Sequence, residues 1–359
     1  MPARSQELKI GIGFNKQTGT GLTTTTPAQV QTALAAGSLW NLNIGAFNVP
    51  FPSFLRENDG EFFGKGHEWI EQIFPTSIDA PWTWPSFLTS QNWAQVSAFA
   101  GGKTTATNPA GSAHQYVTTP MDPAADGVNL PLTSLVAGIR QGTAGEILDI
   151  AMTGMALAGF TLRIQRGPGL ANTSLESRWL GCGGFSNNSG IVIPSRYDEI
   201  RLGAGAATSL LINGVNYLTN FRFVDLEFTY DNGIIGDAGY FPGSGSQSEY
   251  DIRGRMRYGR RTANLVWTVE LESDSQELAD LLASVEGNCE IAITGPVISG
   301  PNSHKMMIEL PRTEHRAYSM TEADGFTVAR VETDIKYDAT SGPMIFTAVT
   351  DRSGIGAAP

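Results

Sequence analysis

The segment ENDGEFFGKGHEW, at positions 57–69, holds the residues of this chain that most resemble a chemical site. Its acidic and imidazole side chains are Glu57, Asp59, Glu61, His67 and Glu68. Such groups can ligate a metal ion or exchange protons with a substrate. However, the segment has no HExxH pattern and does not meet the twelve-residue calcium-loop pattern. We therefore favour a solvated loop or a loop that contacts another subunit over a metal site.

Other catalytic patterns are missing from the sequence. It contains no GxSxG, no P-loop and no GxGxxG after a strand, and no pattern selects two carboxylates as a glycosidase would need. Cys182 lies among glycines in LGCGGF, which favours a strand end before a turn. His114, His304 and His315 fall in separate contexts and are expected to be hydrogen-bonded surface histidines. The sequence thus predicts no enzyme activity and no cofactor.

One basic cluster, IRGRMRYGRR at 252–261, carries arginines at alternate positions of an expected strand. Because side chains alternate along a strand, Arg253, Arg255 and Arg257 would share one face. This stripe could bind nucleic acid, or it could pair with an acidic strand such as VDLEFTYD in the same or a neighbouring subunit. The acidic second half favours the pairing between strands.

Composition and charge narrow the possible functions. The chain has 359 residues, 41% hydrophobic and 16% charged, which is typical of folded domains. Its net charge is −11, of which −2 falls in residues 1–180 and −9 in residues 181–359. A nucleic acid would be repelled rather than held by such a surface. The presence of only two cysteines and the lack of an apolar signal core predict folding in a reducing cytoplasm. No apolar run in the sequence is long enough for a membrane-spanning helix.

The strands and helices that must position the acidic and basic clusters are predicted to follow the same order in the two halves of the chain. In the second half, a strand over 265–271 precedes a short helix that ends at Gly287. The apolar residues at helical spacing in that helix are Leu278, Leu281, Leu282 and Val285. In the first half, a segment containing two tryptophans precedes a helix capped by Thr89 or Ser90. The order strand, short helix, glycine is therefore the same in both halves.

A long polar hairpin loop also recurs at the corresponding place in each half. The first is ENDGEFFGKGH, and its counterpart is DNGIIGDAGYFPGSGSQSEYD at 231–251. We divide the chain into an N-terminal arm at 1–38, a first β-rich module at 39–195 and a second at 196–359. The predicted fold is mainly β with a minor α component: two tandem β-sandwich or barrel modules, each with one short flanking helix and one long hairpin loop.

The chain resembles the two-module tail tube (major tail) proteins of long-tailed bacteriophages. The resemblance rests on stretches that together span most of the chain after residue 10: IGFNKQTG, ENDGEFFGKGHEW, INGVNYLTNFRFVDLEFTYDNG, YFPGSGSQSEYDIRGRMRYGRR, ELADLLASVEGNCEIAITG and YDATSGPMIFTAV. It implies a structural virion protein that forms trimeric, pseudo-hexameric rings stacked into a hollow tube. It further implies assembly in the host bacterial cytoplasm, a tape measure protein in the lumen, and terminator and distal tail proteins at the ends.

The resemblance also assigns roles to residues. Contacts between rings or subunits are expected at Glu57, Asp59, Glu61, His67, Asp231, Asp237, Tyr240 and Phe241. Acids expected to face the lumen, where they would let DNA pass without specific binding, are Asp225, Glu227, Glu270, Glu272 and Asp334. One alternative is another tube-fold tail component, such as a distal tail or baseplate ring.

The other alternative is a β-sandwich glycosidase or carbohydrate-binding module. Its sugar-stacking aromatics would be Trp69, Trp82, Trp84 and Trp93. Burial discriminates between the two functions. In a tube module, Trp84 and Trp267 should occupy similar positions, each packed beneath a helix.

Overall fold

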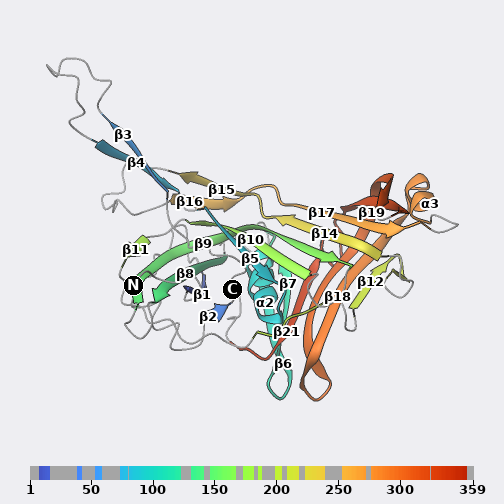
Figure 1. The fold of residues 1–359 in the computed structure, drawn as a ribbon, viewed down its shortest axis with the longest axis horizontal. Helices are drawn as coiled ribbons and strands as arrows, with labels where there is room; N and C mark the ends of the chain where they lie inside the picture. Colours follow the sequence, from blue (N-terminus) through green and yellow to red (C-terminus); the bar gives the residue numbers. More distant parts are fainter. Residues whose placement is uncertain are drawn as a thin grey trace.

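The fold is taken from a computed structural model of the chain. The structure describes residues 8–16, 39–42, 53–58, 73–79, 81–122, 131–140, 146–166, 173–181, 185–187, 199–203, 208–217, 223–238, 253–271, 276–323 and 325–353. Strands dominate and two helices accompany them, as Figure 1 shows. The prediction of a mainly β protein with a minor α component is therefore confirmed.

The first half supplies one helix and eleven strands among the described residues. The helix α2 spans Ser90–Gly101. The strands are β1 (Leu8–Lys16), β2 (Leu39–Leu42), β3 (Ser53–Asn58), β4 (Ile73–Asp79), β5 (Pro81–Phe87), β6 (Gly102–Ala110), β7 (Ala113–Pro120), β8 (Pro131–Arg140), β9 (Glu146–Gln165), β10 (Thr173–Gly181) and β11 (Phe185–Asn187).

The second half supplies the other helix and ten strands in the part that the structure describes. The helix α3 spans Gln276–Leu282. The strands are β12 (Thr208–Ile212), β13 (Val215–Asn216), β14 (Phe223–Asp231), β15 (Ile234–Ala238), β16 (Arg253–Tyr258), β17 (Thr262–Glu270), β18 (Glu286–Ser299), β19 (Asn302–Ala323), β20 (Phe326–Ile335) and β21 (Ile345–Thr350).

A single antiparallel sheet joins seventeen of these strands. One layer of it runs in the order β5, β10, β9, β14, β17, β20 and β19. The long strand β19 then leads into a second layer. Its first part pairs with β18 and β21, whereas the part from Thr313 onward pairs with β20. β21 pairs in turn with β7, and β7 with β6.

The two halves of the chain meet within this sheet. β9 of the first half pairs with β14 of the second, and β7 pairs with β21. Strand pairing thus continues across the boundary that we drew near residue 195. The two-module division stays a prediction, because both halves contribute strands to the same sheet.

The helix α2 lies inside the fold, against β7, β9, β19 and β21. All of its residues are buried. Its start is fixed by a capping box, in which the Thr89 hydroxyl accepts from the Asn92 backbone N–H at 3.0 Å and the Asn92 side chain accepts from the Thr89 N–H at 2.8 Å. Its end is fixed by Gly102, which has a φ of 87°. The predicted cap at Thr89 is confirmed. The expectation of a flanking helix was wrong here, because strands cover α2 on more than one side.

The helix α3 is short and only partly covered. The apolar spacing predicted that Leu282 and Val285 would pack on the sheet, but Leu282 is 78% exposed and Val285 is 39% exposed. Glu277 is instead the buried residue of this helix. The prediction was wrong for these two residues, since Leu282 is the exposed last residue of α3 and Val285 lies beyond the helix, whereas Leu278 and Leu281 are partly buried.

The core is aromatic and connects both layers. Trp93 of α2 meets Phe160 of β9 and Phe346 of β21 edge-on, at ring-centroid distances of 5.7 Å each. Phe160 also lies 5.8 Å from Phe228 and 5.7 Å from Tyr230, both on β14. Such edge-to-face and tilted contacts add to the stabilisation from burial alone. The helix, β9, β14 and β21 are therefore held together by one ring cluster.

The tryptophans named as sugar-stacking candidates lie in this interior. Trp82, Trp84 and Trp93 are 3%, 1% and 0% exposed, and Trp69 lies outside the described residues. Trp82 and Trp84 do stack, but they do so within the core. Trp84 and Trp267 are both buried, each on the strand that precedes a helix. That each of them packs beneath that helix stays a prediction.

Candidate assembly surfaces on the charged face and the hairpins

One face of the sheet is buried and the other carries charge, because side chains alternate along each strand. On β14, Leu226, Phe228 and Tyr230 point into the core, and their intervening neighbours Glu227 and Thr229 are partly exposed. We call the second side the charged face. Its described ionisable residues on β9, β10, β14, β17 and β20, together with Arg166 directly after β9, are Arg163, Glu176, Arg178, Asp225, Glu227, Asp231, Glu270, Arg330, Glu332 and Asp334.

The described carboxylates that were expected to line a lumen lie together on this face, and three of them, Glu227, Glu270 and Asp334, form ion pairs with arginines. Of the five, Asp225, Glu227, Glu270 and Asp334 are described, and Glu272 lies outside the described residues. The ion pairs are Arg163–Glu227 at 2.7 Å, Arg166–Glu270 at 2.5 Å, Arg178–Asp231 at 3.4 Å, Arg316–Glu332 at 2.6 Å and Arg316–Asp334 at 3.2 Å.

These ion pairs shift the pKa values of the charged face and partly neutralise its carboxylates. The hydrogen bond and charge of Glu227 raise the pKa of Arg163, and the hydrogen bond of Arg316 lowers the pKa of Glu332. The face is therefore of mixed charge, and whether its acids line a lumen stays a prediction. The sequence could not show the pairing, because each arginine lies on a different strand from its carboxylate.

An open groove of about 380 Å³ crosses the charged face. Its lining includes Asp225 on β14, Thr268 on β17 and Arg330 on β20. The strand register places these three residues in one row, with Thr268 in the middle. Because the threonine side chain is short, it leaves space between the side chains of Asp225 and Arg330.

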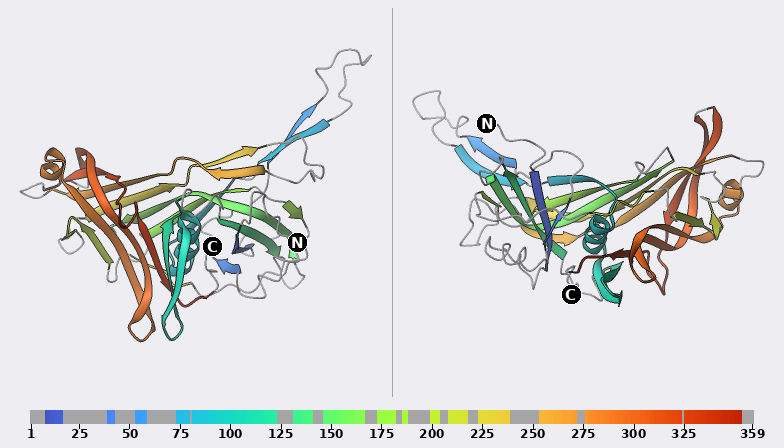
Figure 2. Two further views of the ribbon diagram at one scale, coloured as in Figure 1. Left: turned by 180° about the vertical axis from the view of Figure 1, so that it is seen from behind. Right: turned by 60° about the horizontal axis from the view of Figure 1, so that its bottom comes forward.

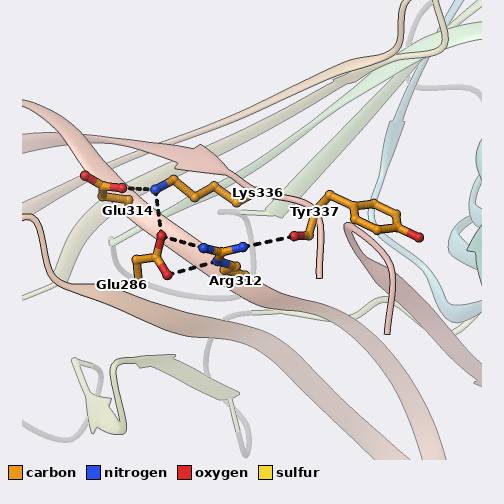
Figure 3. Close-up of polar contacts among 5 residues, drawn as sticks. All are labelled: Glu286, Arg312, Glu314, Lys336 and Tyr337. Carbon is orange, nitrogen blue, oxygen red and sulfur yellow. Dashed lines mark hydrogen bonds and ion pairs between the residues drawn. The ribbon is translucent and has the colours of Figure 1, made fainter. Parts of the chain in front are cut away.

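A second charged cluster lies where β18, β19 and the end of β20 meet, as Figure 3 shows. Arg312 donates to both carboxylate oxygens of Glu286, from Nη2 at 2.8 Å and from Nε at 3.0 Å. Lys336 bonds the same carboxylate at 2.9 Å and also pairs with Glu314. The hydrogen bonds from Arg312 and Lys336 lower the pKa of Glu286 to about 2. Beside the cluster, Tyr337 is 68% exposed.

Two separate hairpins accompany the main sheet. β3 pairs only with β4, and β15 only with β16, among the strands that the structure describes. Figure 1 and the two views of Figure 2 show the β3–β4 hairpin extending well beyond the rest of the molecule. The long hairpin predicted in each half is thus present as a pair of strands.

Two of the predicted contact residues lie on the strands of these hairpins. Glu57 lies on β3 and Asp237 on β15, and the residues outside the described part are Asp59, Glu61, His67, Tyr240 and Phe241. Asp231 differs, because it lies on β14, where its side chain pairs with Arg178 and accepts from the Gly233 N–H at 2.7 Å. It belongs to the charged face and to the base of the second hairpin.

The basic strand lies in the second hairpin. Arg253, Arg255 and Arg257 are on β16, and the register sets Asp237 of β15 opposite Arg255. The acidic strand VDLEFTYD, which we considered as a pairing partner, instead forms β14 and pairs with β9 and β17. Within the described part of the chain, β15 is therefore the neighbour of the basic strand.

Two of the three histidines expected at the surface are buried. His304 is 5% exposed and His315 is 6% exposed, and burial lowers the pKa of each. The Nδ1 atom of His304 lies 2.8 Å from the hydroxyl oxygen of Ser90, at the start of α2. The sequence missed this contact, since 214 residues separate the two partners.

The same polar network ties the chain end to the helix. Gln91 donates from Nε2 to Asp351 at 3.0 Å and accepts from the Ile200 N–H at 3.2 Å. The Thr89 hydroxyl donates to Glu199 at 2.9 Å. The start of α2 thus holds the segment between the two halves and the segment after β21.

No group of three or more potential metal-ligating side chains occurs within the described ranges, which leave out most of the acidic loop at 57–69. Cys289 is buried in the core, where desolvation raises the pKa of its thiol, and Cys182 lies outside the described part. In the part of the chain with described structure, no helix is long and apolar enough to cross a membrane.

Comparison with known proteins gives no assignment. No protein-family model matches the chain, and no curated protein matches it.

Proposed function

We propose that the chain is a structural subunit of a bacteriophage tail tube, which assembles with copies of itself into stacked rings. The observation that carries the proposal is that, among the described strands, the β3–β4 and β15–β16 hairpins pair with no other strand, and that β15 makes only a few contacts with β4 and β9. An isolated two-stranded hairpin is marginally stable in water and gains stability when it packs against another surface. In a stacked assembly, a neighbouring subunit supplies that surface.

The sheet supports the same proposal. A tube wall requires a broad, rigid element with one buried face, and the ring cluster around Phe160 joins the strands of both layers into one body. On the charged face, Arg163 and Arg166 form ion pairs with Glu227 and Glu270, so these arginines offer DNA no continuous basic stripe. DNA could pass such a face without being bound.

The partners follow from this role. They are further copies of the chain, a tape measure protein in the lumen, and terminator and distal tail proteins at the tube ends. In the assembled virion the subunit would belong to the tail, after assembly in the bacterial cytoplasm. Neither catalysis nor a cofactor is part of the proposal.

The experiment is electron microscopy of the purified protein at high concentration, alongside a variant with a shortened second hairpin. Replacing residues 239–252 by Asn-Gly retains β15 and β16 and joins them by a two-residue turn. Wild type should form hollow tubes, and the shortened variant should stay folded but unassembled. Isolated rings that never stack would favour a distal tail or baseplate ring component, and long tubes from the shortened variant would show that this loop is not needed for stacking.

A further inference from the structure

Two other hairpins end side by side at the lower edge of the molecule in Figure 1. The β6–β7 hairpin turns at 110–113 and the β18–β19 hairpin turns at 299–302. Their ends are in close contact, since a Cβ added to Gly111 would lie 2.1 Å from the Ser299 hydroxyl oxygen. We call these two turns, with the bulges before them, the double tip.

Both hairpins of the double tip are built in the same way. The β6–β7 register shifts between Thr107 and Ala110, a stretch that contains Pro109. The β18–β19 register shifts between Thr294 and Val297, a stretch that contains Pro296. Proline fits a bulge because it has no N–H to lose from the ladder. Gly111 and Gly300 then turn the chain with φ values of 58° and 56°.

The bulges present an apolar surface to solvent. Val297 lies between two successive register shifts and is 65% exposed. Bulges re-aim side chains and often occur at functional places. The exposed prolines and alanine around Val297 are Pro109, Ala110, Pro296 and Pro301.

Charge is missing from this surface. Neither 104–113 nor 291–304 contains Asp, Glu, Lys or Arg. Exposed strands and turns usually carry charge, since charge prevents unwanted association. An uncharged, rigid and partly apolar projection is instead suited to a specific contact.

The β3–β4 hairpin also has apolar residues in its sequence and lies at the other side of the molecule. These residues are Phe54, Leu55, Ile73, Phe74 and Ile78, beside the charged Arg56, Glu57 and Asp79, and the register sets Phe54 opposite Ile78. Figure 1 and the left view of Figure 2 show this hairpin rising from the side opposite the double tip. A head-to-tail stack brings opposite sides of successive subunits together.

We infer that the double tip is the surface on which the β3–β4 hairpin of a second copy of this chain docks. This inference rests on the proposed function, because it names the two surfaces that meet when subunits stack. The contact is heterologous, so each subunit uses its hairpin on one side and its double tip on the other. Chains of subunits can then grow without limit.

The test compares two equally exposed apolar residues. Val297→Asp places a carboxylate in the double tip, and Met320→Asp places one at a residue that is 64% exposed on β19, outside it. Both variants should fold with unchanged melting temperatures, since both side chains are mostly in solvent. Val297→Asp should raise the critical concentration for assembly by about tenfold or more, because docking would bury an unpaired charge. Met320→Asp should assemble like wild type.

A mixing experiment tests the partnership itself. Phe54→Asp should impair the hairpin and leave the double tip intact, whereas Val297→Asp does the reverse. At a concentration where wild type stacks, each variant alone should fail to stack. A mixture should form a species of twice the mass in light scattering, because the intact hairpin of the Val297→Asp variant can dock on the intact double tip of the Phe54→Asp variant. If wild type assembles and Val297→Asp assembles equally well, or if the mixture shows no mass increase, the inference is wrong. If wild type does not assemble at all, the proposed function itself fails.

Discussion

The imidazole of His304 contacts the hydroxyl of Ser90 at 2.8 Å, inside the protein and at the start of α2. Gln91 lies on the same turn of the helix, and the charged group that acts on His304 from the segment after β21 is Asp351. Burial disfavours the charged imidazole more than Asp351 favours it. The folded protein therefore favours the neutral form of this histidine more than the unfolded chain does.

A pH dependence of stability follows from this contact. Because the pKa of His304 is lowered in the folded protein, the unfolded chain binds more protons below the ordinary histidine pKa of about 6.5. The free energy of unfolding should then fall as pH drops below that value. His304→Asn should weaken this dependence in melting curves recorded between about pH 7.5 and 5.5, and His315→Asn should add to the effect. An unchanged pH slope in the double variant would contradict this account.

The cap of α2 makes a second prediction. The Thr89 hydroxyl accepts from the Asn92 N–H and donates to Glu199, so Thr89→Ala removes both bonds. The expected loss is about 1–2 kcal/mol in the free energy of unfolding, which denaturant titration measures. Thr89→Ser keeps the hydroxyl and serves as the matched control, with a smaller loss. Equal losses in the two variants would show that the hydroxyl does not hold the helix start.

The aromatic cluster predicts a larger effect. Phe160 is fully buried and contacts Trp93, Phe228, Tyr230 and Phe346. Phe160→Ala should therefore cost about 3–5 kcal/mol in the free energy of unfolding. The same substitution at Phe326, which is 57% exposed, should change it by less than about 1 kcal/mol. Similar costs at both positions would contradict the description of this core.

The charged cluster of Figure 3 predicts a shifted titration. Arg312 is the largest cause of the low pKa of Glu286, which lies at about 2. Arg312→Ala should raise that pKa toward the ordinary glutamate value, while Lys336→Ala should have a smaller effect. Carboxyl-carbon NMR of labelled glutamate reads the two shifts directly. A Glu286 titration that is insensitive to both substitutions would exclude the cluster in solution.

Local patterns predicted the strands and the first helix well. The cap at Thr89 and the strand before it could be found because capping and alternation are properties of neighbouring residues. The end of α3 was misjudged for the opposite reason. Nothing in the apolar spacing of Leu282 and Val285 shows where a helix stops when most of its described contacts are with one strand, β19.

Contacts between residues far apart in the chain could not be predicted from the sequence. Arg163 meets Glu227 only because β9 and β14 are neighbours, and Ser90 meets His304 only because β19 passes the start of α2. The repeated order of elements suggested two modules, but it could not show that β7 would pair with β21. The acids of the charged face were found, and the arginines that pair with them were not.

The central claim is that this chain polymerises through its own surfaces. Its most direct measurement is negative-stain electron microscopy of the wild-type protein, incubated at high concentration with no other component. The account predicts stacked rings or hollow tubes with threefold or pseudo-sixfold end views. Uniform monomers at every concentration, including with tail initiators added, would contradict it.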